Sequence, residues 1–243
     1  MADQKISALT AYITPKSGDL LSIVDTSNAT TKEVDILNLG IVDGWIPATG
    51  SCTYASASTI TVPSGAASLY QKGDRIKWTQ TTVKYGVIVT VADTLLTIAV
   101  NTDYVVTNAA ITLNYYSHSA SPIGYPGWFA WTPTWTGFSA NPAITAKFSI
   151  IGNTICIVID NVTGNGTSNT TTLTITNAPV PALRTIQLLG YIGATDNGAN
   201  VAQPGHAETT ATSATISFWK SFYQGAWTGS GAKAIRCQLS YEF

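Results

Sequence analysis

Apolar and polar residues alternate with a period of two through most of this chain, which predicts β-strands rather than helices. In residues 44–120 short apolar runs recur between turn residues, a spacing typical of small sandwiches and barrels. The runs 86–91 and 95–100 are joined by a short polar connection and are predicted to form a hairpin. The other strand-like runs of this part are 59–62, 75–78 and 110–113.

Residues 121–127 are rich in Gly and Pro and form a joint. After them, four bulky residues occupy every second position, so they are expected to line one face of an extended segment. They are Phe129, Trp131, Pro133 and Trp135. At the other end of this part, apolar residues alternate from 235 to 243, which predicts that the C-terminus is tied into a sheet.

Two further runs, 154–162 and 171–176, flank the polar tract 163–169. Because that tract is rich in Thr, Asn and Gly, the two runs are predicted to pair as a hairpin around it. The remaining predicted strands are 188–192 and 215–221.

Residues 1–43 hold about half of the acidic side chains of the chain. Within them, Val34 and Ile36 alternate with charged neighbours, which favours a half-buried strand at 31–37. A segment of this length buries too little apolar surface to fold alone, so it is expected to dock on another surface. The predicted fold is therefore all-β, with short N-terminal strands (1–43), a small β-barrel-like module (44–120) and a C-terminal antiparallel β-sandwich (124–243).

The composition narrows the functions that this fold could serve. Charged residues make up 10% of the chain, against ~25% in typical globular proteins. The net charge of −1 gives no basic surface for nucleic acid. No run approaches the roughly 20 apolar residues of a membrane-spanning helix, and the polar first residues are unlike a signal peptide. We therefore expect a protein made in the cytoplasm that neither binds nucleic acid nor inserts into a membrane.

Three cysteines, Cys52, Cys156 and Cys237, are too few for a disulfide framework and match no zinc or redox spacing. Cys156 and Cys237 lie in apolar alternating runs, where a free thiol behaves as a small buried hydrophobe. A bridge between these two cysteines is the alternative that the sequence leaves open.

Groups for catalysis or metal binding are sparse. His118 lies in a polar stretch and His206 in a Pro-Gly loop, and neither has a nearby Cys, Asp or Glu at metal-binding spacing. Hydrolysis of glycans needs a positioned pair of carboxylates, and few are available. After residue 120 the carboxylates are Asp160, Asp196, Glu208 and Glu242. We therefore predict no catalytic residue, no metal and no cofactor.

Five aromatic residues within positions 218–227, beside a Gly- and Ser-rich loop, are the strongest signal of a binding surface. Aromatic faces stack on sugars and anchor protein contacts. The competing interpretation is that these residues belong to the hydrophobic core, because alternate residues of a strand face inward and large aromatic side chains are mostly buried. The candidate ligand-binding residues are Trp219, Phe222, Tyr223, Trp227 and the turn residue Asn197.

Several stretches resemble virion proteins of tailed bacteriophages. The first ten residues, with 19–25 and 31–33, resemble the short N-terminal segment of phage fibre and spike proteins. The middle part is similar to a module that recurs in phage structural proteins, and 131–142 resembles the start of a C-terminal domain in the same proteins. The stretches of the middle part that carry the similarity are 53–65, 73–85, 114–117 and 121–126.

This resemblance implies a virion protein, made in the bacterial host, that attaches through residues 1–43 to another virion protein of the tail, baseplate or capsid. It also implies a tail fibre or receptor-binding protein whose residues after 124 contact a host-surface glycan or protein. A head fibre or capsid decoration protein with a structural role is the first alternative, and a glycan-degrading spike is the second. The implied anchor residues are Ile6, Leu9, Asp19, Leu20, Leu21, Ile23 and Asp25.

A homotrimer is expected as well. The low charge and a mean hydropathy of +0.17 leave few ionic groups to keep a monomer dispersed. Sheet edges are usually guarded by charges, yet the strands 154–162 and 235–243 carry few, so we expect them to be buried between subunits. The number three follows from the resemblance, since phage fibres are generally trimeric. The alternative is a monomer whose Thr, Ser and Asn side chains hydrate its surface.

Overall fold

The computed structural model describes residues 20–25, 30–35, 43–142, 144, 146–159, 166–186 and 189–243, with the backbone alone for the first two ranges. Strands in three antiparallel sheets make up the regular structure, and this confirms the predicted all-β fold. The helical elements among these residues are two short 3₁₀ turns, and no described helix is long and apolar enough to cross a membrane. The turns are η3 (Ala66–Ser68) and η4 (Thr102–Tyr104).

The N-terminal sheet is a hairpin of β1 (Leu20–Asp25) and β2 (Thr30–Asp35). It confirms the strand predicted from residue 31 as far as Asp35. Among the described residues this hairpin pairs with no strand of the other two sheets. The predicted anchor residues Ile6, Leu9 and Asp19 lie outside the described residues, and Leu20, Leu21, Ile23 and Asp25 form β1.

The middle module is a curled seven-stranded sheet with the strand order β3-β9-β6-β7-β8-β5-β4. β7 and β8 pair from Gly86↔Val100 to Ala92↔Leu95, which confirms the predicted hairpin. Its core contains Trp78, Ile88 and Leu96, all with no exposed surface. The strand predicted at 110–113 begins later, at Thr112. The strands are β3 (Ile46–Pro47), β4 (Thr53–Ser56), β5 (Thr59–Thr61), β6 (Arg75–Thr79), β7 (Val83–Ala92), β8 (Leu95–Val100) and β9 (Thr112–Ser117).

The C-terminal unit is a ten-stranded sheet with the order β10-β12-β13-β19-β15-β17-β18-β14-β11, in which β16 pairs with β15. β10 and β11 follow each other in the chain but lie at opposite ends of this order, so the segment that joins them rolls the sheet into a sandwich. The strands are β10 (Phe129–Trp131), β11 (Trp135–Thr136), β12 (Ala146–Ile151), β13 (Thr154–Ile159), β14 (Thr174–Ile175), β15 (Tyr191–Asp196), β16 (Ala199–Asn200), β17 (Gly205–Thr209), β18 (Ile216–Trp219) and β19 (Ala234–Glu242).

The core of this sandwich follows the parity of the sequence. Phe129, Trp131, Pro133 and Trp135 are all buried, as their shared parity predicts. The inward positions of β19, and Phe243 directly after it, are filled by apolar side chains, so the predicted tie of the C-terminus into a sheet is also confirmed. These inward residues are Ile235, Cys237, Leu239, Tyr241 and Phe243.

The hairpin predicted between 154–162 and 171–176 is wrong. β13 pairs with β12 on one side and with β19 on the other, while β14 pairs with β11 and β18. The turn that the prediction missed is Gly152–Asn153, where a positive φ of 58° at Gly152 lets the chain reverse directly between β12 and β13. Residues 160–165, which include Asp160, lie outside the described residues.

A bridge between Cys156 and Cys237 is excluded by the register of β13 and β19. Cys237 lies opposite Ile159 and faces the core, whereas Cys156 lies opposite Ser240, on the other side of the sheet from Ile155 and Ile157. The three cysteines are free thiols. Burial raises the pKa of Cys237 to about 12.

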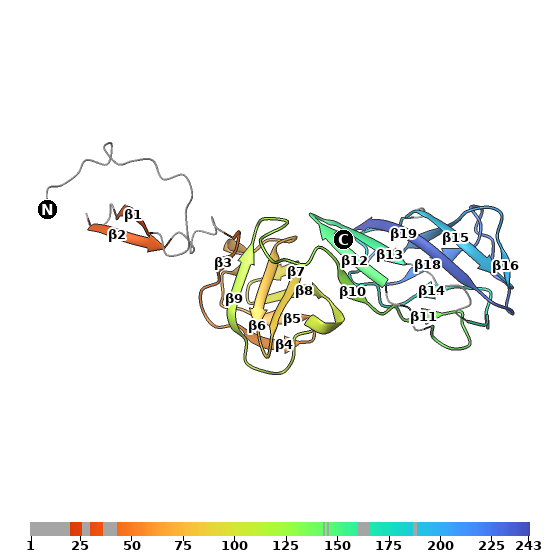
Figure 1. Cartoon of the computed structure of the whole chain (residues 1–243), viewed down its shortest axis with the longest axis horizontal. Coiled ribbons are helices and arrows are strands. Elements are labelled where there is room, and N and C mark those ends of the chain that lie inside the picture. Colours follow the sequence, from red (N-terminus) through yellow and green to blue (C-terminus); the bar gives the residue numbers. More distant parts are fainter. Residues whose placement is uncertain are drawn as a thin grey trace.

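The middle module and the C-terminal unit share a packed junction (Figure 1). Arg75 of β6 is buried there, and its guanidinium donates hydrogen bonds to the carbonyl oxygens of Ile150 (2.6 Å), Gly73 (2.9 Å) and Ala120 (3.0 Å). Val87, Val89 and Ala99 join the same apolar cluster as Phe129 and Phe148 across the junction.

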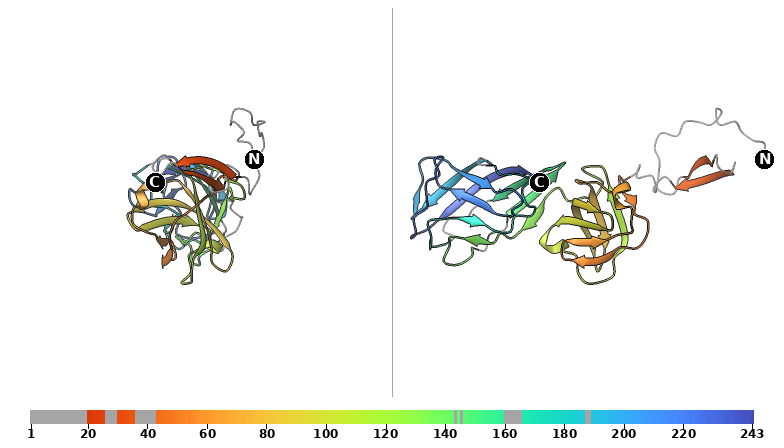
Figure 2. Two further views of the ribbon diagram at one scale, coloured as in Figure 1. Left: turned by 90° about the vertical axis from the view of Figure 1, so that its left-hand side faces the viewer. Right: turned by 180° about the vertical axis from the view of Figure 1, so that it is seen from behind.

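The C-terminus lies at the end of the sandwich that faces the middle module, and the β15–β16 turn lies at the opposite end (Figures 1 and 2). Lys72 of the middle module donates a hydrogen bond to the carbonyl oxygen of Phe243, which holds the end of β19 at the junction. The β15–β16 turn is therefore the part of the sandwich farthest from the middle module (Figure 1).

Candidate functional site

The loop that follows β18 carries two exposed aromatic residues. Phe222 is 48% exposed and Tyr223 is 86% exposed, and their rings meet edge to face with centroids 5.6 Å apart. Phe218 and Trp227 of the same aromatic run are buried, and the Trp227 indole donates to the carbonyl oxygen of Phe218 (2.7 Å). Trp227 is thus a core residue, which corrects its place among the predicted ligand-binding residues.

Asp196 at the end of β15 holds this loop at both of its ends. Its carboxylate accepts a hydrogen bond from Nζ of Lys220 at 2.7 Å, where the loop leaves β18. It also accepts from the backbone N–H of Thr228 at 3.1 Å and from the Thr228 hydroxyl at 2.9 Å, where the loop ends. Burial would raise the pKa of Asp196, but the bonds from Lys220 and Thr228 outweigh it and lower the pKa below the usual value.

A second polar network holds the middle of the loop. Nε2 of Gln224 donates to Oε1 of Glu208 at 2.7 Å, and Nε2 of His206 lies 3.1 Å from the same oxygen. Burial would raise the pKa of Glu208, but the bonds from Gln224 and His206 outweigh it and lower this pKa. Nδ1 of His206 lies 3.2 Å from the carbonyl oxygen of Ser221. Both ring nitrogens of His206 therefore face oxygen atoms.

The backbone of the loop is strained at Gln224, which has a φ of 57° without being a glycine. Backbone strain of this kind persists only where surrounding contacts hold it, and here the Gln224 side chain is held by Glu208. These contacts fix the conformation of the loop, in which Phe222 and Tyr223 are exposed.

Beneath the loop, three residues on neighbouring strands form an outward-facing row. Tyr191 of β15 lies opposite His206 of β17, and His206 lies opposite Trp219 of β18. Tyr191 is 63% exposed, whereas Trp219 is half-buried and His206 is covered by the loop, with the Phe222 ring 6.1 Å from its own. The aromatic surface of this end thus consists of Tyr191, Phe222 and Tyr223, with the edge of Trp219.

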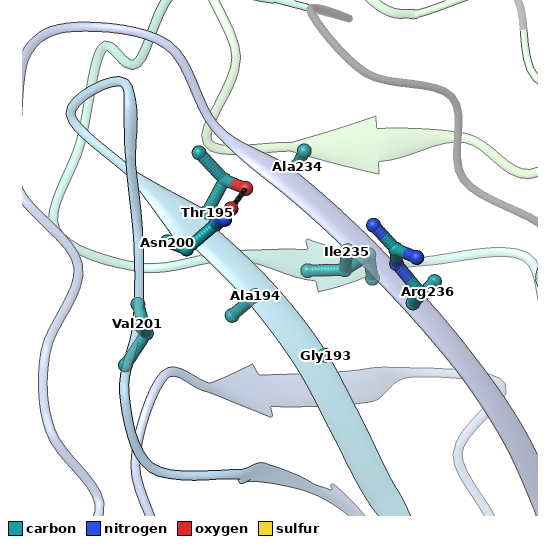
Figure 3. Close-up of a pocket in the computed structure, with 8 residues that line it drawn as sticks. All are labelled: Gly193, Ala194, Thr195, Asn200, Val201, Ala234, Ile235 and Arg236. Atoms are coloured by element: carbon teal, nitrogen blue, oxygen red, sulfur yellow. Dashed lines mark hydrogen bonds between the residues drawn. The ribbon is translucent and has the colours of Figure 1, made fainter.

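A groove of about 330 Å³ lies on the same end of the sandwich, between β15, β19 and the chain that returns after β16 (Figure 3). Its floor is Gly193, which lies opposite Arg236 in the pairing of β15 with β19. Thr195 and Asn200 face it from the β15–β16 turn, where the Thr195 hydroxyl donates to the Asn200 side-chain oxygen at 3.0 Å.

The predicted turn at Asn197 is confirmed. Asn197 and Gly198 have φ of 50° and 79°, the two positive values that a type I′ hairpin turn requires. Asn197 is exposed, and a Cβ added to Gly231 would approach its side-chain oxygen to 2.0 Å. Asn197 therefore packs against the segment that leads into β19, near both the groove and the aromatic loop.

Each histidine contacts one acidic side chain. Besides the contact of His206 with Glu208, Nδ1 of His118 lies 2.9 Å from Asp74. Within the part of the chain that the structure describes, no three His, Cys, Asp or Glu side chains converge on a metal position. Of the described carboxylates after residue 120, Asp196 and Glu208 serve the loop, and Glu242 pairs with Arg184.

Sequence reasoning found the aromatic pair but missed what holds it. The polar residues of the two networks were considered only as acids or as turn residues, because most of their partners lie 15 to 32 positions away in the chain. One local signal was available, since His206 and Glu208 are two apart on a strand and therefore lie on one face.

Comparison with known proteins does not assign this chain to a family. The chain matches no protein-family model, and no curated protein matches it. Function is therefore inferred from the described site together with the resemblance noted in the sequence.

Proposed function

We propose that the chain is a fibre-type appendage protein of a tailed phage virion, which attaches through residues 1–43 and contacts the host cell surface with the loop of residues 220–228. The observation that carries this proposal is the exposed Phe222–Tyr223 pair, in a loop held by two polar networks around Asp196 and Glu208. Large rigid aromatic side chains supply contact area at low entropic cost, and they stack on sugars as well as on protein surfaces.

The position of the loop supports the proposal. Asp196, which holds the loop, ends the strand that leads into the β15–β16 turn, at the end of the sandwich away from the middle module (Figure 1). A protein held at its N-terminal side would therefore present this loop outward.

The N-terminal hairpin supports attachment. β1 and β2 form a two-stranded sheet that pairs with neither larger sheet among the described residues. An isolated two-stranded hairpin is marginally stable in water at best, so a docking surface would stabilise it.

The test of host contact is competition for adsorption, in which the purified chain competes with particles for host cells. We expect the double variant Phe222→Ala/Tyr223→Ala to compete at least about tenfold less well, because such aromatic anchors dominate contact energies. Trp128→Ala is the matched control, since Trp128 is exposed to the same 48% as Phe222 but lies outside the loop. Equal competition by the double variant and the unaltered chain would contradict host contact through this loop.

The test of attachment is removal of residues 1–43. Both apolar clusters of the described residues are formed from residue 52 onward, so the chain 44–243 is expected to remain folded. It should fail to join particles, as measured by immunoblotting of purified virions. Antibody labelling of residues 124–243 on whole particles then separates a tail position from a head position, and release of reducing sugar ends would indicate a glycan-degrading spike instead.

A further inference from the structure

We propose that the groove between β15 and β19 binds a carboxylate-bearing sugar, with Arg236 as the residue that recognises the carboxylate. This inference rests on the proposed function, because it names the chemical class of host-surface ligand. Thr195, which lines the groove, directly precedes Asp196, the residue that holds the aromatic loop.

The size and shape of the groove suit a small ligand. Its volume of about 330 Å³ is at the lower end of the range of about 300–1,000 Å³ that is typical of small-molecule sites. Because Gly193 has no side chain, the stem of Arg236 packs directly over it: a Cβ there would lie 3.0 Å from Cγ of Arg236 and 3.4 Å from its Cδ. The stem of Arg236 therefore lies across Gly193 and leaves its guanidinium at the side of the groove (Figure 3).

The polar groups around the groove match an acidic sugar. A guanidinium presents a planar fork of donors that pairs with both oxygens of a carboxylate. Arg236 is exposed and donates no hydrogen bond to any described residue. Because the Thr195 hydroxyl donates to the side-chain oxygen of Asn200, the Asn200 NH₂ group is left to donate to a ligand hydroxyl.

An aromatic ring completes the site. Tyr191 is two residues before Gly193 on β15, so its side chain stands on the same face of the sheet. It is 63% exposed and lies outside the lining of the groove, so its ring is open to the apolar face of a sugar that extends from the groove along β15. The Arg236 cation and the Tyr191 ring thus lie on one face of β15 and β19, and the Asn200 amide lies beside Thr195 on the neighbouring β16.

The experiment uses the purified full chain and two acidic probes, oligogalacturonate and oligomannuronate, each compared with its methyl ester. Esterification removes the negative charge and keeps the sugar rings. By ligand-observed NMR and calorimetry we expect at least one acidic probe to bind, and its ester to bind at least about tenfold more weakly, as loss of a charge-assisted bidentate contact implies.

Two variants locate the binding. Arg236→Ala should weaken binding of the acidic probe at least about tenfold, and Arg236→Lys should retain part of the affinity because the charge remains without the planar fork. Arg184→Ala is the matched control, since Arg184 is 62% exposed and pairs with Glu242 near the other end of β19. Unchanged melting temperatures would show that the variants are folded.

Three results would overturn the inference: no binding of either acidic probe, equal binding of acid and ester, or unchanged binding by Arg236→Ala. Failure of the acidic-sugar site can be distinguished from failure of the proposed function, because probe binding and host adsorption are measured in separate experiments. If Phe222→Ala/Tyr223→Ala abolishes adsorption while Arg236→Ala binds the probes and adsorbs like the unaltered chain, host contact stands and the acidic-sugar site does not.

Discussion

Lys233 is a charged side chain with no exposed surface. Its ammonium donates to the carbonyl oxygens of Thr170 (2.8 Å) and Gly137 (3.2 Å) and lies 5.6 Å from the centre of the Trp227 ring. It thereby ties the start of β19 to the loops around β11 and β14, which are far away in the sequence. Burial lowers the pKa of this lysine, as is expected for a cation removed from water.

We predict that Lys233→Ala lowers the free energy of unfolding by about 3 kcal/mol, because it leaves a cavity and two carbonyl oxygens without their donor. Lys233→Met should cost less, since it fills the space and removes the buried charge. Urea denaturation of both variants measures the difference. If the two variants lose the same stability, filling of the cavity does not matter at this position.

The free energy of unfolding should fall at alkaline pH, because a buried thiol and two buried phenols keep their protons in the folded chain and lose them in the unfolded chain. The pKa of Cys237 is raised by burial from 9.0 to about 12, and burial also raises the pKa values of Tyr125 and Tyr241. Above pH 9 the unfolded chain loses the Cys237 proton while the folded chain keeps it, so the stability is full below pH 9 and falls as the pH rises towards 12.

We therefore predict a free energy of unfolding that falls between pH 8 and pH 10.5 and a smaller fall in Cys237→Ala. Urea denaturation at both pH values measures it, under reducing conditions. Cys156→Ala is the control, because Cys156 lies on the other face of the sheet from the core. An equal loss of stability in the Cys237 variant and the unaltered chain would contradict this assignment.

At the scale of elements, the loop after β18 is fixed by contacts with β15 and β17 rather than by its own sequence. We predict that Asp196→Ala releases it, because Lys220 and Thr228 then lose their common acceptor. Removal of one partner from a half-buried ion pair with hydrogen bonds is expected to cost about 2–3 kcal/mol.

Limited digestion with chymotrypsin measures this release directly, since Phe222 and Tyr223 are aromatic cleavage sites within the loop. Cleavage there should be faster in Asp196→Ala than in the unaltered chain, and Asp196→Asn should be intermediate because its amide oxygen still accepts from Thr228. Exposed Asp103 in η4 offers a control position that makes no contact with the loop. Equal cleavage rates in all variants would show that Asp196 does not hold the loop.

At the scale of the whole molecule, one reason for expecting a trimer is corrected. The strands 154–162 and 235–243 were expected to be sheet edges, but β13 and β19 lie inside the ten-stranded sheet. The described strands at the ends of a sheet are instead β3 and β4 in the middle module, β10 and β11 in the C-terminal sheet, and the two strands of the N-terminal hairpin, while β16 pairs with β15 on one side. The low charge and the resemblance to phage fibres still favour assembly.

We predict that the purified chain has the mass of three copies of 25.6 kDa in light scattering at micromolar concentration. Closed rotational symmetry would bury unpaired strand edges between subunits. Measurement on the chain 44–243 shows whether the N-terminal hairpin contributes to assembly. A mass near 25.6 kDa for the full chain would refute the trimer.

The sequence by itself determined the all-β character of the chain, several of its strands and which side of those strands faces inward. The period of two and the turn residues are local properties, so the face formed by Phe129 and Trp135, the alternation along β19 and the hairpin of β7 and β8 could all be predicted. The exposed aromatic pair was part of the predicted ligand surface, although Trp227 was wrongly included in it.

Only the tertiary structure decided which strands pair and which polar residues are buried. Local alternation is the same whether β13 lies beside β14 or beside β19, because pairing depends on register and on complementary faces far apart in the chain. A buried Lys233, Arg75 or Asp196 is stable only where distant segments supply the carbonyl oxygens, hydroxyls and ammonium groups that replace water. No pattern within a short window of sequence shows those partners.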